Sequence, residues 1–293
     1  MTELFNISRQ AYYQLLTTKS KTALEVKTIC RLVLQIRRTM PRIGGRKLYY
    51  LLQPEFVRLG INIGRDRFFD ILRREHLLVK KRKNHTRTTN SYHRYRKYNN
   101  LLQHTRITRP EQAWVSDITY IRTRKGFLYL SLVTDAYSKK IMGYELSDNL
   151  KTESSLRALK KAVKNRKYAD KSLIHHSDRG FQYCSPTYTQ MLETNGINIS
   201  MTTKYDPYEN AVAERVNGIL KSEFFLDQTF YNKQHALREV KRTIDVYNSL
   251  RPHLSCNYLT PNQAHNTGNY KLKQWSRNFS SREASLEENK TYI

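Results

Sequence analysis

The sequence predicts an α/β domain with a mixed five-stranded sheet, preceded by a smaller helical domain. Three observations predict this arrangement. Up to about residue 78, apolar residues recur at the three- and four-residue spacing of a helix face. From residue 114 the pattern changes to short alternating segments that are typical of strands. Helical and strand-like segments then alternate, and the 293 residues suffice for one or two domains.

The helical part is expected to contain three helices. They are expected over residues 22–40, from Gly44-Gly45 to about Pro54, and over residues 65–76. Pro41 ends the first helix, because proline cannot continue a helix, and Gly60 and Gly64 punctuate the second connection. The last two helices are typical of a helix-turn-helix over about residues 43–76, although a small helical bundle with a basic surface fits equally well. We expect Arg65 and Arg67 of the third helix to contact DNA.

The α/β part is expected to begin with a meander of three antiparallel strands. These strands are expected at residues 114–121, 127–134 and 140–146, with later strands at 172–177 and 197–201. Helices are expected at residues 152–167, 185–195, 207–225 and 233–249. This is the element order of a ribonuclease-H-like domain. We therefore divide the chain into a helical DNA-binding region (1–78), a basic linker (79–108), an α/β core (109–268) and a polar tail (269–293).

The net charge identifies nucleic acid as the leading partner. The chain carries 52 Lys and Arg against 25 Asp and Glu, a formal charge of +27. Residues 1–110 hold 25 basic and 6 acidic residues, so this third of the chain carries +19 and the remainder only +8. Such an excess repels itself unless a polyanion is close by.

The basic linker contains no acidic residue between Glu75 and Glu111. Its cations include Lys80, Lys81, Arg82 and Lys83, and tyrosines follow them. Lys and Arg release condensed counterions from phosphates, and aromatic rings can stack on bases. We expect these four residues to bind DNA backbone without sequence preference; the alternative is a solvated linker that touches nothing specific.

Secretion and membrane insertion are not expected. The first ten residues lack the apolar run of a signal peptide, and the longest apolar stretch, residues 127–133, is far too short to cross a bilayer. Cys30, Cys184 and Cys256 suit neither a disulfide framework nor a Cys-x-x-Cys metal site, which favours a reducing cytoplasm.

Three acidic residues stand out by their positions in the predicted elements. Asp117 lies in mid-strand, where aspartate is disfavoured and costly to bury without a partner. Asp178 ends a later strand, and Glu214 shares one helix face with Asn210 and Lys221. Alone, each has an ordinary alternative: an Asp paired with a local cation, a turn Asp, and a solvated polar stripe. Together, Asp117 and Asp178 are expected on adjacent strands, with Glu214 on a helix beside them.

Three converging carboxylates repel one another strongly, and divalent cations relieve this repulsion. Oxygen-only ligands suit Mg²⁺, with Mn²⁺ as an alternative. Two such ions can activate a nucleophile and stabilise the leaving oxygen in an in-line phosphoryl displacement. We therefore expect Asp117, Asp178 and Glu214 to bind two metal ions; no Ser/His or Cys/His arrangement competes with this site.

Three motifs surround these carboxylates. They are Trp114-x-x-Asp117-Ile118-Thr119-Tyr120, His176-Ser177-Asp178-Arg179-Gly180-x-Gln182-Tyr183 and Asn210-Ala211-x-Ala213-Glu214. They resemble the catalytic motifs of DDE transposases, above all the insertion-sequence-three family, whose catalytic core is similar to retroviral integrase. Thirty-five residues separate Asp178 from Glu214, as in that family. The segment Tyr247-Asn248-x-x-Arg251-Pro252-His253, followed by Pro261-x-x-Ala264, resembles the family's C-terminal signature, and the resemblance spans about residues 40–266.

The resemblance implies a role for each matching residue. Asp117, Asp178 and Glu214 would be the catalytic, metal-binding triad, and Lys221 would contact terminal DNA two helical turns after Glu214. Asn210 would bind DNA or the metal shell, or else only begin the helix. His176, Arg179, Arg251 and His253 have structural alternatives. Glu209 stands where family members often have Asp, which leaves the triad intact.

The resemblance further implies a DNA transposase that cleaves and transfers strands at the ends of a mobile element. Its partners would be transposon ends and target DNA, bound by a homo-oligomer in the prokaryotic cytoplasm at the nucleoid. Two alternatives remain: a decayed transposase that acts as a DNA-binding repressor, and a ribonuclease-H-type nuclease that only hydrolyses.

Overall fold

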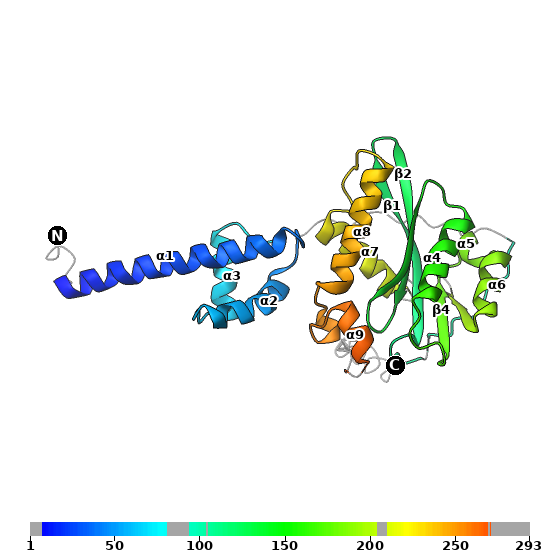
Figure 1. Cartoon of the computed structure of the whole chain (residues 1–293), viewed down its shortest axis with the longest axis horizontal. Helices are drawn as coiled ribbons and strands as arrows, with labels where there is room; N and C mark the ends of the chain where they lie inside the picture. Colours follow the sequence, from blue (N-terminus) through cyan, green and yellow to red (C-terminus); the bar gives the residue numbers. More distant parts are fainter. Residues whose placement is uncertain (1–7, 81–93, 104, 204–209, 269, 271–293) are drawn as a thin grey trace, which may run out of the picture.

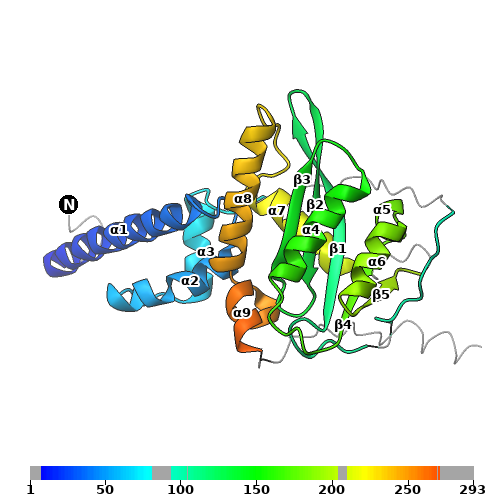
Figure 2. The ribbon, with the colours of Figure 1, turned by 45° about the vertical axis from the view of Figure 1, so that its right-hand side comes forward.

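The computed structural model describes residues 8–80, 94–103, 105–203, 210–268 and 270. In this part of the chain, a five-stranded sheet lies between two layers of helices, and three N-terminal helices lie beside one of these layers (Figure 1). Figure 2 shows α4, α5 and α6 on one face of the sheet and α7 and α8 on the other. None of the described helices is long and apolar enough to span a membrane.

The N-terminal helices are α1 (Arg9–Arg37), α2 (Gly45–Arg58) and α3 (Arg65–Arg74). Ser8 caps α1 by accepting a hydrogen bond from the Ala11 amide, so α1 begins well before the expected residue 22. The prediction that the second helix stops near Pro54 is wrong, because Pro54 lies inside α2. Leu52 and Phe56 are buried on either side of it, and their packing offsets the hydrogen bond that proline cannot donate.

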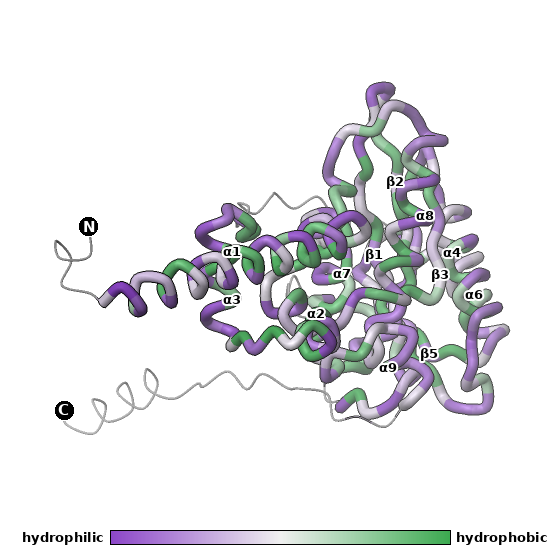
Figure 3. Tube along the Cα trace, turned by 60° about the vertical axis from the view of Figure 1, so that its left-hand side comes forward, coloured by the Kyte–Doolittle hydropathy of each residue, from purple (hydrophilic) through white to green (hydrophobic). Residues whose placement is uncertain are grey.

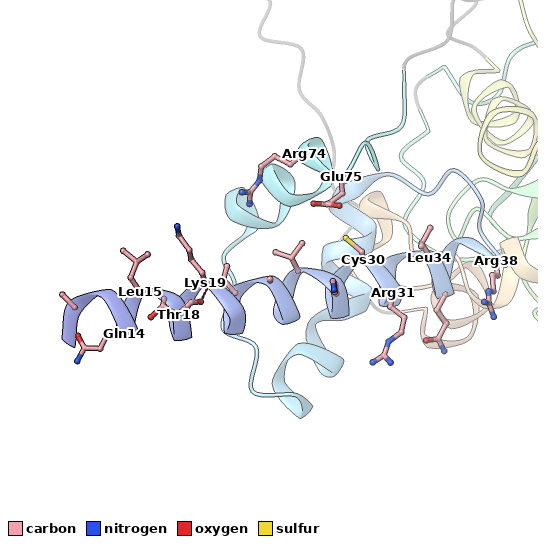
Figure 4. A pocket seen from close by; sticks show the side chains of 16 residues that line it. Gln14, Leu15, Thr18, Lys19, Cys30, Arg31, Leu34, Arg38, Arg74 and Glu75 are labelled. Atoms are coloured by element: carbon pink, nitrogen blue, oxygen red, sulfur yellow. Dashed lines mark hydrogen bonds between the residues drawn. The ribbon is translucent and has the colours of Figure 1, made fainter. Parts of the chain in front are cut away.

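The first half of α1 extends beyond the other helices (Figure 1). A groove of about 1290 Å³ follows this helix from Ala11 to Arg38 and reaches the end of α3 at Arg74 and Glu75. Its side chains include Leu15 and Leu34 (Figure 4).

The sheet has the strand order β3-β2-β1-β4-β5. The strands are β1 (Ala113–Thr123), β2 (Gly126–Asp135), β3 (Ile141–Ser147), β4 (Leu173–Ser177) and β5 (Ile197–Met201). The first three pair antiparallel, whereas β4 pairs parallel to β1 and β5 parallel to β4. The mixed five-stranded, ribonuclease-H-like sheet is therefore confirmed.

The helices of this part follow the predicted order. They are α4 (Thr152–Lys164), α5 (Phe181–Cys184), α6 (Pro186–Thr194), α7 (Ala211–Phe224), α8 (Lys233–Ser249), the short 3-10 helix η2 (Leu254–Cys256) and α9 (Pro261–Thr267). The α7 start differs from the expected residue 207, and residues 204–209 lie outside the described part. The proposed tail beyond residue 268 also lies there, apart from Tyr270.

Alternate residues of β1 pack on opposite faces of the sheet. Trp114 joins an apolar cluster with α4 and α6, and Ile121 joins one with α7 and α8. The second cluster continues without a break into the core of the three N-terminal helices, through residues such as Leu48 and Phe68. Along the hydropathy-coloured trace, hydrophobic stretches lie in the strands, and the β1–β2 turn is hydrophilic (Figure 3).

Gly143 lets β3 and α4 approach closely. A Cβ atom at this position would lie 2.2 Å from the Ala158 carbonyl oxygen and 2.6 Å from the Ala162 nitrogen. Both atoms are helix backbone, so no side chain can rotate away to make room. The close contact between β3 and α4 therefore requires a glycine at position 143.

Gly143→Ala is expected to destabilise the protein by about 3 kcal/mol, because the added methyl group overpacks the contact of β3 with α4. Gly218→Ala is the matched control: a Cβ on Gly218 meets nothing within 4 Å in the interior of α7. That change should stabilise by ~0.5–1 kcal/mol. Urea unfolding measures both; equal effects of the two substitutions would contradict the close approach.

Candidate active site

The parallel pairing of β1 with β4 brings the first two predicted carboxylates together. The ladder ends at the pair Val115 and His176, and Asp117 and Asp178 both lie two residues beyond it. Both side chains are half-buried. The expectation that they sit on, or at the end of, adjacent strands is therefore confirmed.

The Asp117 carboxylate is held by two hydrogen bonds. Asn217 of α7 donates its Nδ2 to Oδ2 at 2.7 Å, and the Ile118 amide donates to Oδ1 at 2.8 Å. Burial, together with the negative charges of Asp178 and Glu214, raises the pKa of Asp117 to about 7, although the two hydrogen bonds lower it. The other two carboxylates are thus close enough to disfavour a negative charge on Asp117.

Glu214 lies in the first turn of α7, and its side chain is exposed. Asn210 precedes that helix and donates its Nδ2 to the Ser116 carbonyl oxygen at 3.1 Å, which ties the start of α7 to β1. Among the described residues, no three His, Cys, Asp or Glu side chains are close enough together to hold a metal ion. The Glu214 side chain would therefore have to move towards Asp117 and Asp178 to share one.

The chemistry of the site fits a divalent cation. Its donors are carboxylate oxygens, which Mg²⁺ and Mn²⁺ prefer, and a cation would relieve the repulsion that raises the Asp117 pKa. The Oδ1 atoms of Asn210 and Asn217 are buried beside Ser116 and Asp117 and have no partner in the described part of the chain. Such orphaned acceptor oxygens commonly bind an ordered water or ion.

Lys221, two turns after Glu214, is half-buried. Burial lowers the pKa of Lys221, and the nearby Asp117 carboxylate raises it. The ammonium group thus lies within electrostatic range of the Asp117 carboxylate, and its contact with DNA stays a prediction. His176 is fully buried and shares a 2.8 Å hydrogen bond between its Nδ1 and Ser200 of β5, which supports its structural alternative.

The DNA contacts predicted outside this site are only partly described. Arg65 pairs with Asp66 at 2.9 Å, and Arg67 pairs with Glu25 of α1 at 3.3 Å, yet both arginines remain largely exposed. Lys80 is exposed, whereas Lys81, Arg82 and Lys83 lie outside the described residues. Contact of these residues with DNA stays a prediction.

A half-buried ionic cluster joins the N-terminal helices to α7. Glu223 of α7 accepts hydrogen bonds from Arg251 at 2.7 and 2.8 Å and from Lys47 of α2 at 3.1 Å. Arg251 is only 2% exposed, and its Nη1 lies 2.8 Å from His253 Nε2. Burial alone would raise the Glu223 pKa, but Arg251 and Lys47 lower it below its ordinary value. The structure thus supports the structural alternative for Arg251 and His253.

Comparison with known proteins identifies the family. Two models of the integrase core domain match residues 107–207 and 195–261. A 31 kDa protein of insertion element IS600 from Shigella sonnei is 32% identical over 265 residues, which is 89% of this chain and 96% of that protein. The transposase InsF for insertion sequence IS3A from Escherichia coli K12 is 35% identical over 158 residues, or 54% of each chain. The chain belongs to the insertion-sequence-three family of DDE transposases.

This transposase also matches the transposase of insertion sequence IS629 from Shigella sonnei, at 35% identity over 49% of its own length and 48% of that protein. It thus spans about half the length of the IS629 and IS3A relatives. Among solved structures, it is similar to the HTLV-2 integrase catalytic core domain in complex with magnesium, at 19% identity and a TM-score of 0.44, covering 55% of this chain and 99% of that one. The simian T-cell lymphotropic virus intasome gives 16% identity and a TM-score of 0.49, covering 86% of this chain and 80% of that one.

The sequence missed two residues that shape the transposase site. Asn217 holds Asp117, and its place on the Glu214 face of α7 was the only available signal. Tyr183 is buried, and burial first, then the negative charges of Asp117 and Asp178 among others, raise its pKa well above the ordinary value. Its position in the second motif did not indicate that it would be buried within electrostatic range of these carboxylates.

Proposed function

We propose that this transposase cleaves a phosphodiester at each end of its insertion element and joins the exposed 3′-hydroxyl to target DNA. One observation supports this proposal most directly. Asp117 and Asp178 lie side by side, each two residues beyond the last pair of the parallel strands β1 and β4, and Glu214 lies on the neighbouring helix α7. In the first step, a water oxygen bonds to phosphorus and the P–O3′ bond breaks. In the second, the freed 3′-oxygen bonds to a target phosphorus and displaces another 3′-oxygen.

Asp117, Asp178 and Glu214 would hold the metal, two Mg²⁺ ions with Mn²⁺ as an alternative, which would supply positive charge for the attacking and leaving oxygens. Asn217 keeps the Asp117 carboxylate turned towards α7, and Asn210 fixes the start of that helix against β1. Lys221 would bind a phosphate of the element end beside the carboxylates. These side chains therefore orient the DNA and the ligands before any bond changes.

We assign the recognition of element ends to the helical region, residues 1–78, where α3 presents Arg65 and Arg67. The basic linker, residues 79–108, would add contacts to the DNA backbone, and residues 109–268 would form the catalytic unit. Strand transfer requires an element end and a target to be held at once, so we propose that the transposase acts as a homo-oligomer on DNA.

Metal removal and salt should separate chemistry from DNA binding. With Mg²⁺, labelled DNA that carries the element ends should give joined strands; EDTA should abolish both cleavage and joining but leave end binding largely intact. High salt should instead weaken binding, because the basic residues release counterions from phosphates. Gel analysis of the products and fluorescence anisotropy measure the two effects.

An Asp178→Asn variant tests the alternatives in the same assay. It should bind the ends as the wild type does and join no strands. Normal joining by this variant would overturn the proposed site. Wild-type protein that binds the ends and never cuts would indicate a repressor, and cutting without joined products would indicate a nuclease that only hydrolyses.

A further inference from the structure

A cavity of about 690 Å³ lies where α2, α7 and the segment around η2 meet. Its volume is within the roughly 300–1,000 Å³ that is usual for small-molecule sites. One part of its lining is apolar and aromatic, and consists of Phe69, Val212, Val216, Ile219, Leu254 and Tyr258. The ring of Tyr258 stacks on that of Tyr50, with 4.3 Å between their centroids, which fixes this wall.

The other part of the lining is strongly cationic. It is formed by Arg46, Lys47, Lys139, Arg215 and Arg251, and no Asp or Glu is among the lining residues that the structure describes. Glu223, which does not line the cavity, pairs with Lys47 and Arg251 and offsets one of their two positive charges. Arg46 and Arg215 are exposed and form no ion pair with a carboxylate of the described residues, so they remain free to bind an anion.

The cations lie close together around His253. This imidazole also lines the cavity, and its pKa lies well below the ordinary value because it is buried beside Arg251, Lys47, Lys139 and Arg215. A group of four cations on one side of a cavity attracts a phosphate. The cavity therefore combines a phosphate-binding side with a wall for a flat apolar group.

The cavity adjoins the catalytic helix. Ala211 and Arg215 line it from the first two turns of α7, and Glu214 lies between them in sequence, on the neighbouring side of the helix. A DNA strand with one phosphate at Glu214 can thus place a neighbouring nucleotide at the cavity.

We propose that this cavity is a subsite for one unstacked nucleotide of a single-stranded DNA segment, with its phosphate at Arg46 and Arg215 and its base against Phe69 and Tyr258. A duplex phosphate alone would leave the apolar wall uncovered, whereas a base covers it by stacking. The inference rests on the proposed function, because it places this nucleotide beside the phosphodiester at Glu214. It concerns binding, however, and is tested without catalysis.

The test compares two probes of one arbitrary sequence: a blunt duplex, and the same duplex with a short single-stranded 3′ extension. Fluorescence anisotropy should show that the full chain prefers the extended duplex. Ser255→Trp fills the cavity without changing its charge and should reduce this preference about tenfold. Arg215→Gln should make the negative slope of log binding constant against log salt concentration shallower by roughly 0.7 for the extended duplex. Lys164→Gln, an exposed cation on α4 across the sheet, should change neither.

The outcomes separate this subsite from the proposed catalytic site. A wild type without the preference, or a Ser255→Trp protein that keeps it, would overturn the subsite. A lower thermal midpoint of Ser255→Trp would mean that this variant is destabilised. The subsite is then tested with Arg46→Gln and Arg215→Gln, whose wild-type side chains are exposed. If neither variant changes the salt dependence of binding, the proposal is overturned. Glu214→Gln should keep the preference and lose strand joining. Retained joining in that variant would refute the catalytic site alone.

Discussion

Asp117→Asn is expected to lower strand cleavage by roughly 10³-fold and also to stabilise the metal-free protein at pH 8. The loss of activity follows because an amide binds a divalent cation weakly, and removing several kcal/mol of charge stabilisation costs about a factor of ten per 1.4 kcal/mol. The gain in stability follows because the pKa of Asp117 rises on folding from 3.8 to about 7. A carboxyl group with a raised pKa opposes folding increasingly as the pH rises between those two values.

The stabilisation should be on the order of 2 kcal/mol at pH 8, after allowance for the partial solvent exposure of the side chain. It should be small near pH 4 and vanish below about pH 3, where the carboxyl group is protonated in the folded and unfolded states alike. Denaturant unfolding in EDTA at pH 4 and pH 8 measures it. The asparagine oxygen can still accept the Asn217 hydrogen bond, whereas the Ile118 amide loses its acceptor, and this loss offsets part of the gain.

Asp170→Asn is the control, because it removes the same charge from an exposed position. It should change stability at pH 8 by less than ~0.5 kcal/mol and leave cleavage intact. Mg²⁺ should raise the thermal midpoint of the wild type and of this control, but hardly that of Asp117→Asn. An Asp117→Asn protein no more stable than wild type at pH 8 would contradict the electrostatic repulsion at the site.

Arg251→Ala should destabilise the transposase by about 3–5 kcal/mol, because it removes a fully buried side chain and two charge-assisted hydrogen bonds to the Glu223 carboxylate. Arg251 is 2% exposed and makes two of the hydrogen bonds to that carboxylate. Lys47 alone would then have to balance Glu223. Urea unfolding monitored by far-UV circular dichroism measures the loss.

Arg242→Ala is the matched control, since Arg242 pairs with Glu239 on the exposed face of α8 at 2.9 Å. Its loss should cost no more than ~0.5 kcal/mol. Removing two of the three charges of the cluster, in Glu223→Gln with Arg251→Met, leaves only the partly exposed Lys47 and should cost less than Arg251→Ala. Equal losses for Arg251→Ala and Arg242→Ala would show that the Glu223 cluster contributes nothing of its own.

The order of the elements could be predicted from the sequence because each long element shows its own periodicity. β5 and α8 begin and end at the predicted residues, 197–201 and 233–249. The four-residue helix α5 was missed because one turn shows no periodicity. The second helix was predicted to end near Pro54 because proline is a poor helix former. In the structure α2 continues to Arg58, since its side chains pack in the core on both sides of Pro54.

The candidate site divides in the same way. Adjacent placement of Asp117 and Asp178 followed from the strand pairing expected of a ribonuclease-H-like domain, and the structure confirms it. The pairing of Asn217 with Asp117, 100 residues apart, depends on how α7 lies on the sheet, which no local pattern encodes. The same holds for Glu223, whose partners come from α2 and from the segment after α8.

The apolar core shared by the N-terminal helices and α7, together with the Glu223 cluster, limits which parts of such transposases can be exchanged by recombination. The Arg42 amide donates to the Glu223 carbonyl oxygen at 3.0 Å, and the Leu48 side chain belongs to the same cluster as Val216 of α7. Recombination that exchanged only the helices before residue 79 between relatives would leave mismatched surfaces on both pieces. A chimaera should therefore fold well only when the end of α7 and the residues around Arg251 come from the same parent as α2, so the N-terminal helices and α7 are inherited as one unit.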